Sequence, residues 1–280
     1  MILPEYHTHT YYCDGAEAPE VYIKEAIRQG LPAYGYSSHS PVPFESDWNV
    51  PDDKLQNYIN DINEIKKKYG SEIEIYLGLE VDYIPGVIGR HRHILKDIDL
   101  DYFIGSVHYV NRFDDGRFWN IDTSLELYKE GLEKIFRNDI KKAVVAFYES
   151  NRMMLEEDKP DIIGHFDKIK MYNTQVKFFD ESEGWYKDQI NLLLQEIKKQ
   201  NTIVEVNTRG YYKYGQLDLY PSEWILEKIA NMDIPVMINS DAHHPSEFNK
   251  GTDYAIGKIK NLGITQVYIL KNEKWQSINI

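Results

Sequence analysis

The segment EYHTHTYYCDG, residues 5–15, begins as a short β-rich stretch and carries two histidines two positions apart. In a strand, residues i and i+2 point to the same side, so the imidazoles of His7 and His9 can reach one ion. A single H-x-H pair is a weak sign of a metal, because two histidines often share a polar strand face. Its significance depends on the residues at the ends of the other strands.

Short β-rich segments like this one recur along the whole chain. They are expected at residues 4–8, 33–37, 73–81, 102–107, 161–164, 203–207, 235–239 and 266–270. Amphipathic stretches lie between them, at 19–29, 52–68, 124–156, 183–200, 222–231 and 253–261, and predict helices. The alternation indicates repeated β-α units.

Seven or eight such units, without a Pro/Gly/Ser linker or low-complexity tract, favour an α/β fold with one closed or nearly closed parallel barrel. An open doubly wound sheet is the alternative. The 280 residues suffice for a single domain, because barrels of the TIM type commonly use about 250. Residues 109–161 break the regular spacing. Part of them, around 109–123, is expected to form an insertion near the active face.

Charge and composition narrow the classes of partner and compartment. The 32 basic residues are outnumbered by 45 acidic ones, so the net charge of −13 repels a nucleic-acid backbone. The single cysteine, Cys13, excludes an internal disulfide and favours the cytoplasm.

No apolar run approaches the roughly 18 residues that span a bilayer, and no signal peptide is recognisable, so no membrane partner is expected. A homo-oligomer is compatible with the sequence.

Further side chains that can hold a metal follow the other predicted strands. They are His39, Glu80, His108, His165, Asp241 and His243. Catalytic groups of parallel barrels come from the carboxyl ends of different strands, so these residues are expected at one rim. A single histidine in such a position is more often a hydrogen-bonded core residue than a metal ligand. That interpretation does not account for the whole set, because all of its members follow predicted strands in the same way. Imidazole and carboxylate are the ligands of zinc, iron or manganese.

A second H-x-H pair, His91 and His93, has a different setting. The two residues lie among arginines where a helix is expected to begin. We interpret them as solvent-exposed side chains rather than as ligands.

In their order along the chain, these elements resemble the polymerase and histidinol phosphatase (PHP) family. The motifs are the H-x-H start, CDG at 13–15, the S-x-H-S-P of 37–41, GLE at 78–80, SVH at 106–108, GHFD at 164–167 and DAH at 241–243. The version with CDG, GLEVDY, SVH and GHFD is similar to the histidinol-phosphate phosphatase branch. The resemblance implies a distorted (β/α)7 barrel with a metal cluster at the C-terminal ends of its strands.

The resemblance also implies which residues hold two to three divalent ions of zinc, iron or manganese. The implied ligands are His7, His9, Glu80 and Asp241 for one ion, Glu80, His108 and His165 for a second, and Asp14, His39 and His243 for a third. Glu80 would bridge the first two, and Asp14 stands where other members carry histidine. Two ions about 3.5–4 Å apart lower the pKa of a shared water, which can then attack phosphorus. The general acid stays open between Asp14 and His243.

Two arginines are candidates for holding the phosphate group. Arg209 follows the strand expected at 203–207, so its planar fork would lie at the metal-bearing rim. A surface position is the alternative for this residue. Arg117 lies in the insertion beside Trp119, and this aromatic loop is expected either to close over a substrate or to pack on the barrel.

The leading hypothesis from the resemblance is hydrolysis of L-histidinol phosphate to L-histidinol and phosphate in histidine biosynthesis. The first alternative is a related phosphoesterase that acts on nucleotides or other small phosphomonoesters. A third hypothesis, of a different class, is a metal-stabilised module without catalytic activity, as in a protein that acts on nucleic acid. The negative net charge disfavours this hypothesis, because it repels a nucleic-acid backbone.

Overall fold

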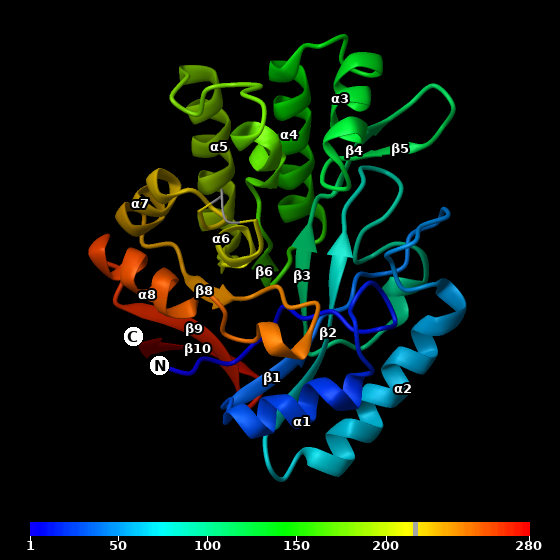
Figure 1. Cartoon of the computed structure of the whole chain (residues 1–280), viewed down its shortest axis with the longest axis vertical. Coiled ribbons are helices and arrows are strands. Elements are labelled where there is room, and N and C mark those ends of the chain that lie inside the picture. The colour runs from blue at the N-terminus through cyan, green and yellow to red at the C-terminus, as the bar shows by residue number, and fades with distance from the viewer. Residues whose placement is uncertain (215–217) are drawn as a thin grey trace.

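A computed structural model of the chain describes residues 1–214 and 218–280 (Figure 1). Its centre is a curled sheet of six strands that pair in parallel, in the order β1-β2-β3-β6-β7-β8. The strands are β1 (Ala33–Tyr36), β2 (Glu74–Asp82), β3 (Tyr102–Ser106), β6 (Ile162–Ile163), β7 (Ile203–Asn207) and β8 (Val236–Asn239). The α/β class with a curved parallel sheet is therefore confirmed.

The first expected strand, residues 4–8, is bound to both edges of this sheet. It forms isolated parallel bridges, from Glu5 to Tyr34 in β1 and from Thr8 to Ala242 just beyond β8. The Gly35 amide donates to the Glu5 carbonyl at 2.8 Å, and the His9 amide donates to the Ala242 carbonyl at 2.8 Å. The segment therefore lies between the two edge strands and carries its histidines to their C-terminal ends.

The last expected strand does not join the parallel sheet, which corrects the upper count of eight β-α units. β9 (Gln266–Lys271) pairs antiparallel with β10 (Lys274–Asn279) in a separate two-stranded sheet. The loop residues Asn272 and Glu273 both have left-handed backbones, with φ of 49° and 60°. Two such residues form the tight turn that favours local antiparallel pairing over a crossover to a parallel neighbour.

Aromatic side chains fill the inside of the curled sheet at its N-terminal end. Tyr102 packs edge-on against Tyr6 with ring centroids 5.9 Å apart, and its hydroxyl donates to the Tyr6 carbonyl at 2.6 Å. The Tyr6 hydroxyl in turn donates to the carbonyl of Leu270 in β9 at 2.7 Å. Gly78 makes room for this packing, because a Cβ there would lie 2.6 Å from the Tyr102 ring. The polar rim at the other end therefore rests on a closely packed floor.

The outer helices follow the expected amphipathic stretches within one or two residues. They are α1 (Pro19–Gln29), α2 (Asp52–Tyr69), α5 (Gly184–Gln200), α7 (Glu223–Asn231) and α8 (Thr252–Asn261). Shorter helical turns are α6 (Arg209–Tyr214), η1 (His93–Asp97), η2 (Lys168–Thr174) and η3 (Pro245–Glu247). No helix in the described ranges is long and apolar enough to cross a membrane.

The stretch expected as one helix over 124–156 is two helices, α3 (Leu125–Lys134) and α4 (Ile140–Glu157). The chain turns between them at Arg137 and Asn138, whose φ values of 53° and 61° are incompatible with a continuous right-handed helix. Each helix has its own N-cap, because Ser124 accepts from the Leu127 amide and Asp139 from the Lys142 amide. The hydrophobic period continues across the break, so periodicity alone could not reveal it.

Residues 109–123 include an antiparallel hairpin that leaves the C-terminal end of β3 (Figure 1). Its strands are β4 (Tyr109–Arg112) and β5 (Phe118–Asn120). Trp119 is fully buried and donates its indole N–H to the Leu127 carbonyl of α3 at 3.1 Å. The amide of Ile121 donates to the carbonyl of His108 at 3.0 Å, so the hairpin is tied at its base to a candidate ligand.

Candidate metal centre

The structure brings the nine predicted ligands together at the C-terminal ends of the strands. Glu80 lies within β2, and the other eight come from connecting segments: His7, His9 and Asp14 from the N-terminal segment, His39 after β1, His108 after β3, His165 after β6, and Asp241 and His243 after β8. All except Asp14 and His243 are buried. Their ligand atoms form four overlapping groups in which all members lie within 4.8 Å of one another.

Glu80 is at the centre of this cluster, and its two carboxylate oxygens face different imidazoles. Oε2 lies 3.1 Å from His7 Nε2 and 2.9 Å from His39 Nδ1. Oε1 lies 3.0 Å from His165 Nε2 and 3.6 Å from His108 Nε2. Burial opposes ionisation, but the surrounding histidines, His7 first among them, hold the pKa of Glu80 well below its usual range. Glu80 is thus an anion with histidines on both sides.

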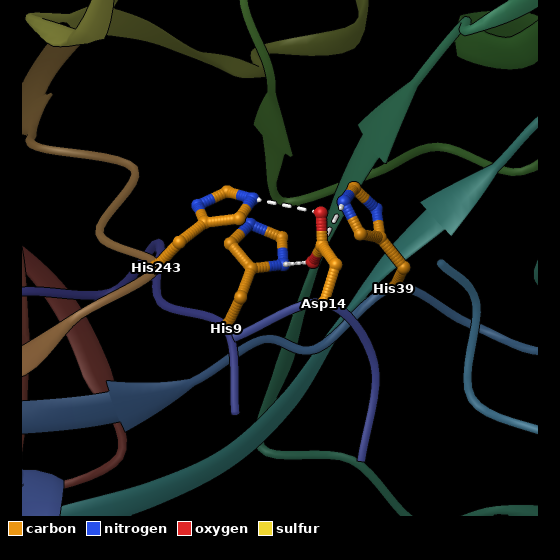
Figure 2. Close-up of side chains that lie close together, drawn as sticks. All are labelled: His9, Asp14, His39 and His243. Atoms are coloured by element: carbon orange, nitrogen blue, oxygen red, sulfur yellow. Dashed lines mark ion pairs between the residues drawn. The ribbon is translucent and has the colours of Figure 1, made fainter. Parts of the chain in front are cut away.

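Asp14 lies on the more exposed side, where three imidazoles converge on its carboxylate (Figure 2). His243 Nε2 is 3.1 Å from Asp14 Oδ2, while His9 Nδ1 and His39 Nε2 are each 3.8 Å from Oδ1. The rings of His9 and His243 have centroids 4.0 Å apart. Burial raises the pKa of Asp14, but His39 and His243 outweigh it and lower the pKa far below the usual value.

Asp241 has a left-handed backbone, with φ of 54°, which is strained for a residue with a side chain. Several contacts hold it there. Its carbonyl accepts from Arg209 Nη1 at 2.7 Å, and its Oδ2 accepts from Asn207 Nδ2 at 3.1 Å. The other oxygen, Oδ1, lies 3.3 Å from His9 Nε2. The strained turn therefore points one carboxylate oxygen at the histidine cluster.

Several ligand atoms of the cluster are buried without a hydrogen-bond partner. They are His7 Nε2, His9 Nε2, His39 Nδ1, His108 Nε2 and both carboxylate oxygens of Glu80. A buried polar atom that lacks a partner costs about 1–3 kcal/mol, so proteins rarely keep several of them side by side. Imidazole nitrogens and carboxylate oxygens that face one point are a donor set for divalent cations. The residues present therefore fit bound metal ions.

Two carboxylates that orient the histidines are not among the sequence candidates. Glu205 Oε1 lies 2.6 Å from His7 Nδ1, and Asp82 Oδ1 lies 2.7 Å from His108 Nδ1. Asp82 has a sequence signal, because it is two residues after Glu80 in β2 and shares its side of the strand. For Glu205 the signal is an acidic residue inside the apolar segment IVEVN.

The two carboxylates also decide which ring nitrogen faces the cluster. Burial raises the pKa of Glu205, but His7 more than offsets this, and the net shift is downward. An ionised carboxylate can only accept, so Nδ1 of His7 carries the proton. Nε2 is then the nitrogen that faces Glu80 and Asp241, and its lone pair would be available to a bound cation.

A cavity opens above the cluster at the C-terminal face of the sheet. It is lined by Asp14, His39, Trp48, Glu80, Asn120, Asp122, Thr123, His165, Lys168, Arg209, Asp241 and His243. Arg209 is thus at the rim expected from the sequence, with its side chain only 12% exposed. Its guanidinium also contacts Glu247 Oε2 at 3.4 Å.

The structure does not bring Arg117 and Trp119 to this cavity. The Arg117 guanidinium is exposed, pairs with Asp115 at 2.9 Å, and covers the ring of Phe113. Trp119 is buried below the hairpin in the core around α3. The hairpin reaches the cavity instead through Asn120, and the residues just after it do so through Asp122 and Thr123.

His91 and His93 lie outside the metal-ligand groups found among the described residues. Both are exposed, and His93 Nε2 pairs with the Asp52 carboxylate at 2.7 Å on the surface. This placement agrees with their interpretation as solvent-exposed side chains.

Comparison with known proteins gives one family. A model described as PHP domain matches residues 5–209, which is most of the chain. The histidinol-phosphatase of Bacillus subtilis (strain 168) is 26% identical over 259 residues, and the match covers 86% of this chain and 93% of that protein. The similarity therefore extends over most of both chains.

Two solved structures share the fold. The crystal structure of hisK from Listeria monocytogenes matches with a TM-score of 0.77 at 24% identity, covering 90% of this chain and 99% of that one. The histidinol phosphate phosphatase of Lactococcus lactis subsp. lactis Il1403, in complex with zinc, L-histidinol and phosphate, matches with a TM-score of 0.70 at 16% identity. That match covers 98% of this chain and 99% of the other.

Proposed function

The chain belongs to the PHP domain family, and on this premise we propose that it is a metal-dependent phosphatase that hydrolyses L-histidinol phosphate to L-histidinol and phosphate in histidine biosynthesis. The observation that carries the proposal is the set of buried, unpartnered imidazole and carboxylate atoms around Glu80 at the floor of an open cavity. Relatives similar over most of the chain are histidinol-phosphatases, which supports this substrate.

The proposed centre holds two or three divalent ions. Zinc is the first candidate because the Lactococcus lactis structure contains it, with iron and manganese as alternatives. Glu80 would bridge two ions, since its oxygens face His7 and His39 on one side and His108 and His165 on the other. A third ion would use Asp14, His39 and His243, and His9 also belongs to that group.

We also propose that residues 4–8 form the seventh strand of a distorted (β/α)7 barrel. Bridges to both edges of the six-stranded sheet support this closure. In this view residues 1–280 make one PHP-type domain, and the hairpin after β3 is its insertion. The consequence for function is that His7 and His9 stand beside Asp241 and His243, although the two pairs lie at opposite ends of the chain.

The bound cations would supply a water of lowered pKa and positive charge beside the phosphoryl oxygens. The protein's own groups do the rest. Glu205 and Asp82 keep the two histidines they contact in the ligating tautomer. Arg209 can clamp phosphate oxygens from the cavity wall, where its fork suits the charge that develops on them. If two ions bind, the Asp14–His243 pair is free to hold a proton for the departing alkoxide.

The leaving group would meet Trp48, the one aromatic side chain other than histidine among the described residues that line the cavity. The Trp48 and His39 rings pack edge-to-face, with centroids 4.4 Å apart. An indole face suits an imidazole ring or a cation.

A turnover panel with metal-reconstituted protein tests the function. L-histidinol phosphate should exceed AMP, glycerol phosphate and p-nitrophenyl phosphate in kcat/KM. A clear preference for AMP would instead assign the chain to the nucleotide-directed alternative. The absence of any turnover by protein with full metal content would favour the module without catalytic activity.

A further inference from the structure

One carboxylate in the cavity wall is not accounted for by the metal centre. Among the described lining residues, Asp14, Glu80, Asp241 and Asp122 carry carboxylates, and the first three belong to the ligand groups. Asp122 does not. Its side chain is 17% exposed, so it is largely shielded but open to the cavity. A shielded acidic group that faces a substrate cavity is suited to bind a cation of the substrate.

The backbone of Asp122 is held firmly in place. Its amide donates to Asn120 Oδ1 at 2.9 Å, and its carbonyl accepts from the Tyr172 hydroxyl at 3.2 Å. The preceding residue, Ile121, donates to the carbonyl of His108 at 3.0 Å. The carboxylate is thus fixed relative to a metal ligand, and a substrate would meet it at a constant distance from the reacting phosphate.

Asp122 forms an ion pair with Lys168, at 2.8 Å between Oδ2 and Nζ. Lys168 begins η2, three residues after His165, and also lines the cavity. Its charge is carried on a flexible four-carbon stem, whereas the short side chain of Asp122 has little freedom. Lys168, whose side chain is 12% exposed, therefore has more rotatable bonds than Asp122 with which to change partner.

We propose that Asp122 binds the ammonium group of the substrate and that Lys168 then turns to a phosphate oxygen. This inference rests on the proposed function and names the substrate feature that the site selects. L-histidinol phosphate carries its amine on the carbon beside the phosphate-bearing carbon, so one small molecule presents both charges. In the free protein Asp122 and Lys168 neutralise each other. In the complex each meets the opposite charge of the substrate, and neither is left buried and unpaired.

The exchange makes the cavity selective for phosphate esters of amino alcohols. An ester without an amine offers nothing to Asp122, which then keeps Lys168 and withholds one phosphate contact. A site that bonds a particular polar group discriminates strongly against analogues that lack it. The expected preference is therefore a property of one ion pair rather than of cavity size.

The test compares Asp122→Asn with the wild type in the full, metal-reconstituted chain on two ester pairs. The pairs are L-histidinol phosphate against p-nitrophenyl phosphate, and phosphoethanolamine against glycerol phosphate. Loss of a charge-assisted contact should lower kcat/KM for each amine-bearing ester by roughly 10- to 100-fold. The amine-free esters should retain their values or gain, because the ion pair that withholds Lys168 from their phosphate is lost. Metal content should be unchanged.

Two further variants sharpen the comparison. Lys168→Met should reduce kcat/KM for the amine-bearing esters more than for the amine-free ones, since Lys168 reaches the phosphate only when an ammonium group occupies Asp122. Asp115→Asn, an exposed position in the turn of the β4–β5 hairpin that precedes Asp122, is the matched control and should change kcat/KM for neither ester class. Equal losses on both ester classes in Asp122→Asn, or full activity on the amine-bearing esters, would overturn the proposal. If the wild type rejects L-histidinol phosphate, the proposed function fails, while the second ester pair still decides the role of Asp122.

Discussion

Nδ1 of His7 lies 2.6 Å from Oε1 of Glu205, although the two residues are 198 positions apart in the chain and both are fully buried. The contact ties the N-terminal segment to β7 and leaves Nε2 of His7 facing Glu80 at 3.1 Å. The orientation and tautomer of this candidate ligand therefore depend on a residue of a distant strand.

Replacing Glu205 with Gln should weaken metal binding while the fold survives. Gln keeps the shape but loses the charge that fixes the His7 tautomer, and removal of such partners typically costs roughly 10- to 100-fold in metal affinity. Chelator competition measures this affinity. Asp82→Asn should act similarly through His108, and Glu64→Gln, an exposed residue on α2, is the control. Unaltered affinity in Glu205→Gln would remove its assigned role.

Glu80→Gln is expected to be the most damaging single change among the ligands. A bridging carboxylate neutralises and spaces two cations at once, and an amide offers one neutral oxygen in its place. Turnover should be abolished and the metal content should fall, while circular dichroism shows a folded chain. Near-normal activity in this variant would show that Glu80 does not bridge.

Elemental analysis of gently purified protein should give two to three divalent ions per chain. The ligand atoms form four overlapping groups, two of which include Glu80, and these are more than a single tetrahedral or octahedral ion can use. A reproducible single equivalent, unaffected by added manganese, zinc or iron, would contradict this prediction.

Chelation should also lower thermal stability, because the buried ligand atoms lose their partners. Metal at a hundred times its dissociation constant contributes about 2.7 kcal/mol, which corresponds to a fall in Tm of roughly 5–10 °C. Calorimetry before and after chelation measures the change. Adding zinc or manganese back should restore Tm. A Tm that is unchanged by chelation would mean that the buried atoms of the cluster have partners without metal.

Arg209→Ala should lower kcat/KM for the best substrate without emptying the metal centre. Loss of a contact that strengthens as charge develops on the phosphoryl oxygens costs about 2–4 kcal/mol, or roughly 30- to 1,000-fold. Lysine should rescue only partly, because a point charge cannot reproduce the bidentate fork.

Arg209 also holds the strained Asp241 turn, so the metal content of Arg209→Ala must be measured in the same samples. Activity and metal lost in parallel would show that the arginine acts by holding Asp241. A wild-type value of kcat/KM in Arg209→Ala would mean that another residue holds the phosphate group.

Gly78→Ala should destabilise the fold by about 1–3 kcal/mol or more, because the added methyl group overlaps the Tyr102 ring and the Tyr36 carbonyl. Gly257→Ala in α8 is the matched control. Its Cβ meets no atom within 4 Å, and alanine in a helix interior is favoured over glycine by roughly 0.5–1 kcal/mol. Urea unfolding compares the two variants, and equal stabilities would refute the packing role of Gly78.

Local sequence pattern alone predicted many of the helices and strands of this protein. The bounds of α1 and β7 agree with those expected from periodicity, because a buried face repeats every 3.6 or 2 residues. The gathering of His7, His39, Glu80 and their companions could be anticipated for a related reason. The carboxyl ends of parallel strands share one edge, so residues at those ends meet wherever the strands lie in the chain.

The features that sequence pattern could not predict depend on contacts between distant segments of the chain. The Glu205–His7 and Asp122–Lys168 pairs join residues from different elements, and no local period records such a pairing. The turn at Arg137 and Asn138 is a change of backbone angle within an unbroken hydrophobic period. Arg117 and Trp119 follow one another closely in the sequence, yet neither faces the cavity, because packing of the hairpin on α3 buries one and exposes the other.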